Sequence, residues 1–160
     1  MNTIAKLTAL GQSLWMDNIQ RHMLQNGETK AMIDRGEIRG MTSNPTIFEH
    51  AITETGDYSE SLTSLAWAGW DSEKIFWEMA IEDIRSAADL FAALYEETNG
   101  GDGFVSIEVS PLLAGDTEGT IAQAQQLYPF LEIFPISAAK GDNVERLLQA
   151  LVATLPQGEA

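Results

Sequence analysis

Three polar residues stand at the ends of short apolar runs that long helical patterns separate. Asp17 ends the run 13–17, Asn44 follows the run 36–41, and Glu108 lies within the run 104–109. A carboxylate can take up or deliver a proton, and an amide can orient a hydroxyl or a carbonyl group by hydrogen bonding. Two carboxylates and one amide therefore predict chemistry on a small polyhydroxylated molecule such as a sugar.

Each of these three residues also has a structural alternative. Asp17 can be the N-cap of a helix that starts at Asn18, and Asn44-Pro45 is good capping chemistry without any catalytic role. Glu108 is costly to bury in an apolar strand unless it is paired, hydrogen-bonded or protonated. It is therefore either a general acid and base or half of a structural ion pair, and both alternatives stay open at this stage.

Other polar residues point to structure rather than to a cofactor. Asp102 lies in the turn 99–103 and is most simply a turn residue. His22 and His50 have no metal-ligand partner at a suitable spacing, and the chain has no cysteine to provide a thiolate. We therefore expect no metal and no cofactor.

Strands and helices alternate along most of the chain. Strands are predicted at 13–17, 36–41, 104–109 and 131–136, and helices at 2–11, 19–35 with a break at Gly27, 45–52, 57–68, 72–97, 117–127 and 143–155. Such alternation indicates an α/β fold with a parallel sheet, and polar groups at the strand ends are typical of an α/β barrel. Because a complete eight-stranded barrel needs about 250 residues, the 160 residues here predict a partial (β/α)8-type barrel of about four parallel strands with surrounding helices.

The long helical pattern at 72–97 has one apolar side. Its apolar residues recur at spacings of three and four, namely Phe76, Ala80, Ile84, Ala87, Phe91 and Leu94. This spacing favours an amphipathic helix that covers the sheet, as in the outer layer of a barrel.

The charge of the chain excludes some classes of partner. Nine basic and 24 acidic side chains give a formal net charge of −15, which repels nucleic-acid phosphates and anionic lipids. The first residues lack the pattern of a signal peptide, and no apolar run approaches 18 residues. We expect no nucleic acid, no membrane and a cytoplasmic location.

Several separated motifs resemble the N-terminal part of transaldolase over about residues 9–127. They are Leu14–Asp17, Ile38–Glu49, Asp83–Asp89, Asp102–Pro111 and Leu113–Thr117, in the family's order. Transaldolases are (β/α)8 barrels that move a dihydroxyacetone unit between sugar phosphates in the pentose phosphate pathway, through a Schiff base on a lysine. The resemblance implies a transferase acting in carbohydrate metabolism, with a sugar phosphate as its ligand.

The resemblance also implies roles for single residues. Asp17 matches an aspartate that handles substrate hydroxyl protons, and Glu108 matches a glutamate that acts as general acid and base through a water. Asn44 matches an asparagine that hydrogen-bonds the substrate, and Thr42 and Ser43 precede it in the same substrate-binding motif. These implied roles agree with the positions at strand ends.

The nucleophile of the family is missing from its expected place. The family carries its lysine on strand four, close to the pattern Ile-Lys-Ile-Pro-Ala-Thr, and aligning the prolines puts Ile133 at that position. Lys140 is the only lysine after Glu108, and it lies in a turn, where an amine is mostly protonated at neutral pH. Lys140 is therefore an unlikely nucleophile, and we expect the chain to be inactive in isolation.

The last residues have a resemblance of their own. The segment 131–156 is similar to the last strand and helix of an Era-like small GTPase, although the chain has no phosphate-binding loop. We therefore divide the chain into a transaldolase-like partial barrel, 1–127, and a strand-turn-helix unit, 128–160, that packs on the same sheet and can differ from it in origin.

Three hypotheses follow from these patterns. The first is a transaldolase-type enzyme or enzyme fragment, the second a non-catalytic chimeric or truncated α/β protein, and the third a GTPase-derived module. A partial barrel leaves open sheet edges, so we also expect self-association through those edges.

Overall fold

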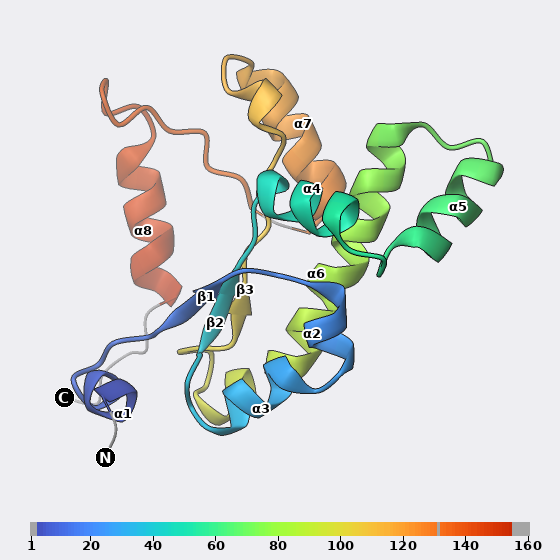
Figure 1. Ribbon diagram of the computed structural model, residues 1–160. Helices are drawn as coiled ribbons and strands as arrows, with labels where there is room; N and C mark the ends of the chain where they lie inside the picture. Colours follow the sequence, from blue (N-terminus) through green and yellow to red (C-terminus); the bar gives the residue numbers. More distant parts are fainter. Residues whose placement is uncertain (1–2, 131, 155–160) are drawn as a thin grey trace. The chain divides into compact units, whose positions relative to one another are not determined.

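The computed structural model describes residues 3–130 and 132–154, and the chain forms two compact units. The first unit extends from Met1 to Glu108 and the second from Val109 to Ala160. The first unit holds a three-stranded parallel sheet with helices packed beside it (Figure 1). The candidate residues Asp17, Asn44 and Glu108 all belong to this first unit.

The first unit follows the predicted alternation of strands and helices. Its elements are α1 (Thr3–Ala9), β1 (Trp15–Asp17), α2 (Arg21–Gln25), α3 (Glu28–Asp34), β2 (Gly40–Thr42), α4 (Pro45–Glu54), α5 (Ser59–Trp67), α6 (Ser72–Glu97) and β3 (Phe104–Val105). The predicted break at Gly27 is confirmed: this glycine separates α2 from α3 and has φ +86°, which a residue without a Cβ adopts readily. The long helix at 72–97 is also confirmed.

The sheet has the order β1-β2-β3, and its register fixes which side chains share a face. Met16, Met41 and Val105 are partners across the three strands, as are Trp15, Gly40 and Phe104. Because side chains alternate along a strand, the two sets point to opposite faces. We call the side of Met16, Met41 and Val105 the covered face and the side of Trp15, Gly40 and Phe104 the open face.

The core of the first unit lies against the covered face. Met41 and Phe91 are fully buried in one cluster, where Met16 and Val105 pack at its margin. Most of the apolar side predicted for α6 belongs to this cluster, with Ala80, Ala87 and Phe91 buried. Figure 1 shows α2 and α3 beside α6, which they contact. Burial of this helical stripe is therefore what holds the sheet in place.

All three strands are shorter than or displaced from their predicted ranges, and β1 begins at Trp15 rather than at residue 13. The predicted strand 36–41 is β2 at Gly40–Thr42, because Gly36 has φ +66° and the Glu37 amide still donates to the Met32 carbonyl at the end of α3. The predicted strand 104–109 is only Phe104–Val105. A ladder needs a partner, and β2, which is three residues long, offers none beyond the bond from the Ser106 amide to the Met41 carbonyl.

The predicted fourth strand is wrong. Leu131 lies outside the described residues, and 132–136 form no strand, so the sheet has three strands rather than about four. The apolar character of the run 131–136 indicated a strand, but a strand also needs a ladder partner, and Pro135 has no amide hydrogen to donate.

The second unit contains a short 3-10 turn η1 (Pro111–Leu113) and two helices, α7 (Thr117–Leu127) and α8 (Val144–Thr154). The helix predicted at 117–127 is confirmed with those bounds. Residues 137–142 form the predicted turn, which a single antiparallel bridge between Ser137 and Asp142 closes. Among residues 3–130 and 132–154, no helix is both long enough and apolar enough to cross a bilayer.

Candidate functional site

The carboxyl ends of β1 and β2 bring Asp17 and Thr42 together. The two residues are register partners, and the Thr42 hydroxyl donates a hydrogen bond of 2.7 Å to Oδ1 of Asp17. Asp17 as a residue is exposed to solvent. Two residues that the sequence placed on different strands therefore form one polar pair at the strand ends.

A second pair joins β2 to the segment after β3. The Ser43 hydroxyl donates to the Ser106 carbonyl at 2.8 Å, and the Ser43 amide donates to the Ser106 hydroxyl at 3.2 Å. Ser43 is 1% exposed. Its buried hydroxyl thus makes a structural bond between the segments that follow β2 and β3, and Ser106 is a member of the site region that sequence reasoning did not single out.

Asn44 makes the capping contact that was its structural alternative. Its side-chain oxygen accepts from the Ile47 amide at 3.0 Å, and Pro45 occupies the first position of α4. The oxygen is therefore engaged, while the side-chain amide group remains a donor that can meet a ligand. The capping role and a binding role are compatible in this geometry.

Replacing Asn44 by alanine should lower the free energy of unfolding by about 1 kcal/mol, because α4 loses the acceptor for one of its first amides. Urea denaturation of the 160-residue protein measures this loss. Asn44→Ser is the matched control, since it keeps a capping oxygen and removes the amide donor. An alanine variant as stable as the parent would show that the cap contributes nothing.

Glu108 is placed differently from its prediction. The sequence placed it inside a buried strand, but it lies three residues after the end of β3 and is exposed. The cost of burying a lone carboxylate therefore does not apply here. The strand is too short to carry Glu108 into an interior, because β2 offers no ladder beyond Ser106.

The open face of the sheet carries both the candidate polar groups and an aromatic group. Asp17 and Thr42 follow Trp15 and Gly40 by two residues, so the alternation of a strand puts them on that face. Trp15 and Phe104 stack with ring centroids 6.4 Å apart, and both are more than 40% exposed. The Trp15 ring lies so close over Gly40 that a Cβ there would be 2.5 Å from it.

The amino ends of the strands carry a separate polar cluster. Asp102 accepts from Nε of Arg39 and from the Ser13 hydroxyl, and its side chain is 12% exposed. Asp102 is thus more than the simple turn residue that the sequence indicated, because it links the starts of all three strands. Arg39 directly before β2 was the signal that sequence reasoning could have used.

A buried polar network lies behind the site and was missed by sequence reasoning. Nε of Arg21 donates to Asp83 at 2.8 Å, and the Tyr58 hydroxyl donates to the other oxygen of the same carboxylate at 2.5 Å. Arg21, Tyr58 and Asp83 are 6%, 1% and 2% exposed. One signal was present, since Asp83 lies three residues after Ala80 and four before Ala87, on the apolar side of α6.

Burial and pairing shift the pKa values in this network. Burial raises the pKa of Asp83, and the hydrogen bond from Tyr58 and the charge of Arg21 oppose that rise without cancelling it. Burial together with the bond to Asp83 raises the pKa of Tyr58 well above its ordinary value. Burial lowers the pKa of Arg21, but the charge and hydrogen bond of Asp83 together with the charges of Glu82 and Tyr58 outweigh it, so this pKa is raised overall.

The two positions discussed for a nucleophile lie in the second unit. Ile133 is an irregular, half-buried residue, and Lys140 is exposed in the turn, where its amide donates to the Ser137 carbonyl at 3.2 Å. The turn position predicted for Lys140 is confirmed. The described residues place neither of them on a strand.

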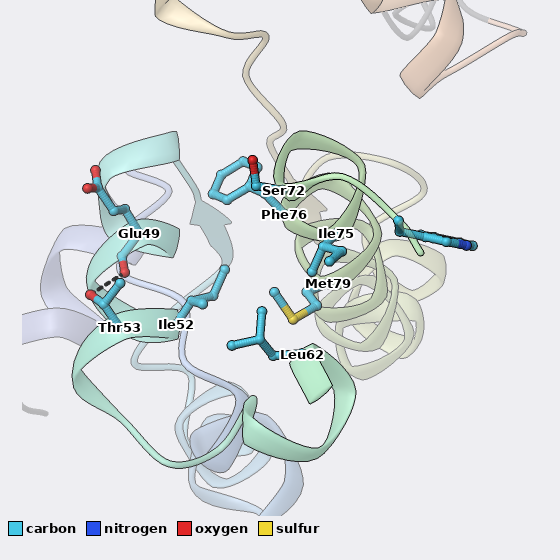
Figure 2. Close-up of a pocket in the computed structure, with 9 residues that line it drawn as sticks. Glu49, Ile52, Thr53, Leu62, Ser72, Ile75, Phe76 and Met79 are labelled. Carbon is cyan, nitrogen blue, oxygen red and sulfur yellow. Dashed lines mark hydrogen bonds between the residues drawn. The ribbon is translucent and has the colours of Figure 1, made fainter. Parts of the chain in front are cut away.

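A hollow of about 390 Å³ lies elsewhere in the first unit, between α4, α5 and α6. Figure 2 shows Ile52 on α4 facing Leu62 on α5 and Met79 on α6, with Glu49 and Thr53 along the α4 side. None of the described residues that line this hollow is a candidate site residue. This apolar hollow is therefore separate from the strand ends.

The strand ends carry the carboxylate of Asp17 bonded to the hydroxyl of Thr42, and Asn44, which caps α4, follows Thr42 by two residues. An exposed carboxylate held by a hydroxyl can accept a proton from a ligand hydroxyl group, and an amide donor can orient a neighbouring oxygen. Glu108 follows Ser106 by two residues and provides a second exposed carboxylate nearby in the chain. The arrangement suits hydroxyl-rich ligands and lacks a described amine on a strand.

The chain is similar in sequence to proteins of one known family. A family model described as Transaldolase/Fructose-6-phosphate aldolase matches residues 14–144. A transaldolase of Trichodesmium erythraeum (strain IMS101) is 44% identical over 127 residues, which cover 79% of this chain and 33% of the relative. A transaldolase of Thiobacillus denitrificans is 40% identical over 132 residues, covering 82% and 37%.

The similarity reaches into the last part of the chain. A transaldolase of Arthrobacter sp. (strain FB24) is 39% identical over 153 residues, covering 96% of this chain and 41% of the relative. Because such a match includes most of 128–160, the resemblance of the tail to an Era-like GTPase is not supported. The chain spans about a third to two fifths of the length of the relatives it matches.

Proposed function

Since the chain belongs to the transaldolase/fructose-6-phosphate aldolase family, we propose that its first unit carries the substrate-handling part of a transaldolase-type site. The reaction is the transfer of a dihydroxyacetone unit between sugar phosphates in the pentose phosphate pathway, in the cytoplasm. The observation that carries the proposal is the hydrogen bond between Thr42 and Asp17 at the strand ends.

In this proposal each candidate residue has one task. Asp17 exchanges protons with substrate hydroxyl groups through the carboxylate oxygen that Thr42 does not bind. Asn44 donates from its amide group, because its oxygen caps α4. Glu108 acts on a water as general acid and base. Ser43 holds the loop after β2 against Ser106 and so keeps Asn44 at the strand ends.

We further propose that the 160-residue chain forms no Schiff base on its own. An amine must be unprotonated to attack a ketose carbonyl, and burial is what lowers the pKa of such a lysine in enzymes. Aligning the prolines puts Ile133 at the position of the family's lysine, and Lys140 is exposed. A non-catalytic truncated or chimeric protein is therefore the second candidate function.

Borohydride reduction in the presence of fructose 6-phosphate should leave the mass of the protein unchanged. The transaldolase of Trichodesmium erythraeum, treated in parallel, is the positive control for trapping. An adduct on a lysine of this chain would overturn the expected inactivity, and its loss in Lys140→Ala would identify the nucleophile.

Ligand binding separates the substrate-handling proposal from the non-catalytic alternative. Fructose 6-phosphate should raise the midpoint of thermal unfolding if the strand ends bind it, because a ligand of the native state stabilises that state. Asp17→Asn should abolish the shift. A thermal transition that the sugar phosphate does not move would favour the non-catalytic alternative.

We also propose that copies of the chain associate through the sheet. β1 and β3 are the two edges, and Trp15 and Phe104 are exposed on the open face beside them. Two chains of net charge −15 repel each other, so association should increase with ionic strength. Sedimentation velocity over a range of concentration and salt measures it, with Phe104→Lys as the weakened variant. A strictly monomeric mass at high concentration and high salt would contradict it.

A further inference from the structure

Asp17 and Arg21 are joined by a short and tightly held connection. Only three residues, 18–20, lie between the end of β1 and the first residue of α2. In the middle of this connection Ile19 is fully buried in the core cluster of the first unit. Because the connection is this short, we expect a displacement of Arg21 to be felt at Asp17.

Arg21 ties this connection to two other helices. Its Nε donates to Asp83 at 2.8 Å, its Nη2 to Glu82 at 2.7 Å, and its Nη1 to Ser61 at 3.1 Å. The guanidinium also lies 4.5 Å from the centre of the Tyr58 ring. All three nitrogens are thus engaged, with Ser61 on α5 and the two carboxylates on α6.

This set of contacts requires the shape of a guanidinium. Three side-chain acceptors bond to three different nitrogens of the planar group, and the Met79 carbonyl accepts a fourth bond at 3.4 Å. An ammonium concentrates its charge at one point and cannot reproduce this set of bonds. Asp83 is 2% exposed, so a carboxylate that loses part of this contact cannot turn to water instead. A lysine here is therefore expected to shift the start of α2.

Among the described residues, the Asp17 side chain has one hydrogen-bond partner across the sheet. Thr42 donates to its Oδ1, and Asp17 as a residue is exposed. Thr42 thus contacts the carboxylate from across the sheet, and residues 18–20 connect the backbone of Asp17 to Arg21.

We propose that Arg21 is a positioning residue for Asp17. By binding α5 and α6 it fixes the connection 18–20 and thereby the direction in which the Asp17 carboxylate meets a ligand. The use of a fixed Asp17 in a reaction rests on the proposed function. The effect of Arg21 on the position of Asp17 does not depend on that function. Arg21 touches no ligand in this proposal and acts only through Asp17.

The test is NMR spectroscopy of the 160-residue protein without ligand, comparing Arg21→Lys with Arg39→Lys. Arg39 is the matched control because its ion pair with Asp102 is also mostly shielded but lies at the amino ends of the strands. Arg21→Lys should move the side-chain carboxyl resonance of Asp17 and speed amide hydrogen exchange at 18–20 by at least about tenfold relative to the global exchange rate. Arg39→Lys should do neither at a comparable loss of stability.

Equal displacement of the Asp17 resonance in both variants, or none in Arg21→Lys, would overturn the proposal. Should Arg21→Lys fail to fold, Tyr58→Phe removes only the hydroxyl that binds Asp83, keeps the ring beside Arg21, and should shift the same resonance by a smaller amount. No Asp17 shift in that variant would equally count against the coupling.

A displaced Asp17 in a protein that binds no fructose 6-phosphate would refute the proposed function and leave the positioning role intact.

Discussion

Replacing Asp83 by alanine should lower the free energy of unfolding by about 3–5 kcal/mol. The substitution leaves the Arg21 guanidinium buried without its buried carboxylate partner, which bonds to Nε at 2.8 Å. It also removes the acceptor of the Tyr58 hydroxyl, which is fully buried and has no route to water. Two buried polar groups therefore lose their partner in one change, and each loss is costly.

Glu82→Ala is the matched control for this prediction. Glu82 binds the same guanidinium at 2.7 Å, but its side chain is 60% exposed, so its removal should cost no more than about 1 kcal/mol. Urea unfolding should show a lower midpoint for Asp83→Ala with an unchanged slope, since the fold is the same. Similar losses of unfolding free energy in the two variants would mean that burial does not determine how much each carboxylate partner of Arg21 contributes to stability.

Replacing Gly103 by alanine should lower the free energy of unfolding by about 2–4 kcal/mol, because two costs coincide. Gly103 has φ +88°, a left-handed conformation that a side chain disfavours. A Cβ there would also be 2.7 Å from the backbone nitrogen of Tyr95 in α6, and a helix backbone cannot give way as a flexible side chain can. The amide of Gly103 donates to the Arg39 carbonyl, so a shift would disturb the start of the sheet.

Gly27→Ala separates the two costs. Gly27 has nearly the same angle, φ +86°, but an added Cβ would meet nothing within 4 Å. Gly27→Ala should lower the free energy of unfolding only by the cost of the left-handed conformation, about 1–2 kcal/mol. The difference between the variants in urea unfolding measures the close approach of the Gly103 loop to α6, and equal losses would show that this approach imposes no constraint.

The helices were predicted well because their signals are local. Asn44-Pro45 at the start of α4 and Asp116 before α7 cap the helices that follow them, and each side chain meets an amide three residues on. The apolar spacing in 72–97 identified the side of α6 that packs on the sheet. What the spacing did not reveal is that Asp83, on the same side, is buried, since its partner Arg21 lies 62 residues away.

The strands were predicted less well because a strand exists only through its partner. The run 131–136 has the composition of a strand, yet 132–136 pair with no strand in the described structure. Glu108 shows the same limit. The sequence placed it in a strand, but β3 ends at Val105 and Glu108 is exposed, and both outcomes depend on elements that a local pattern does not contain.

The amino-acid sequence by itself determined the α/β alternation, the capped helices and the motifs that place the chain in its family, because each depends on neighbouring residues. The tertiary structure alone decided that Thr42 holds Asp17, that Ser43 binds Ser106, and that Glu108 is exposed. It also decided that Arg21 and Asp83 form a buried pair. Burial, ladder pairing and ion pairing all depend on residues distant in the chain, and their free energies are set only once the fold brings those residues together.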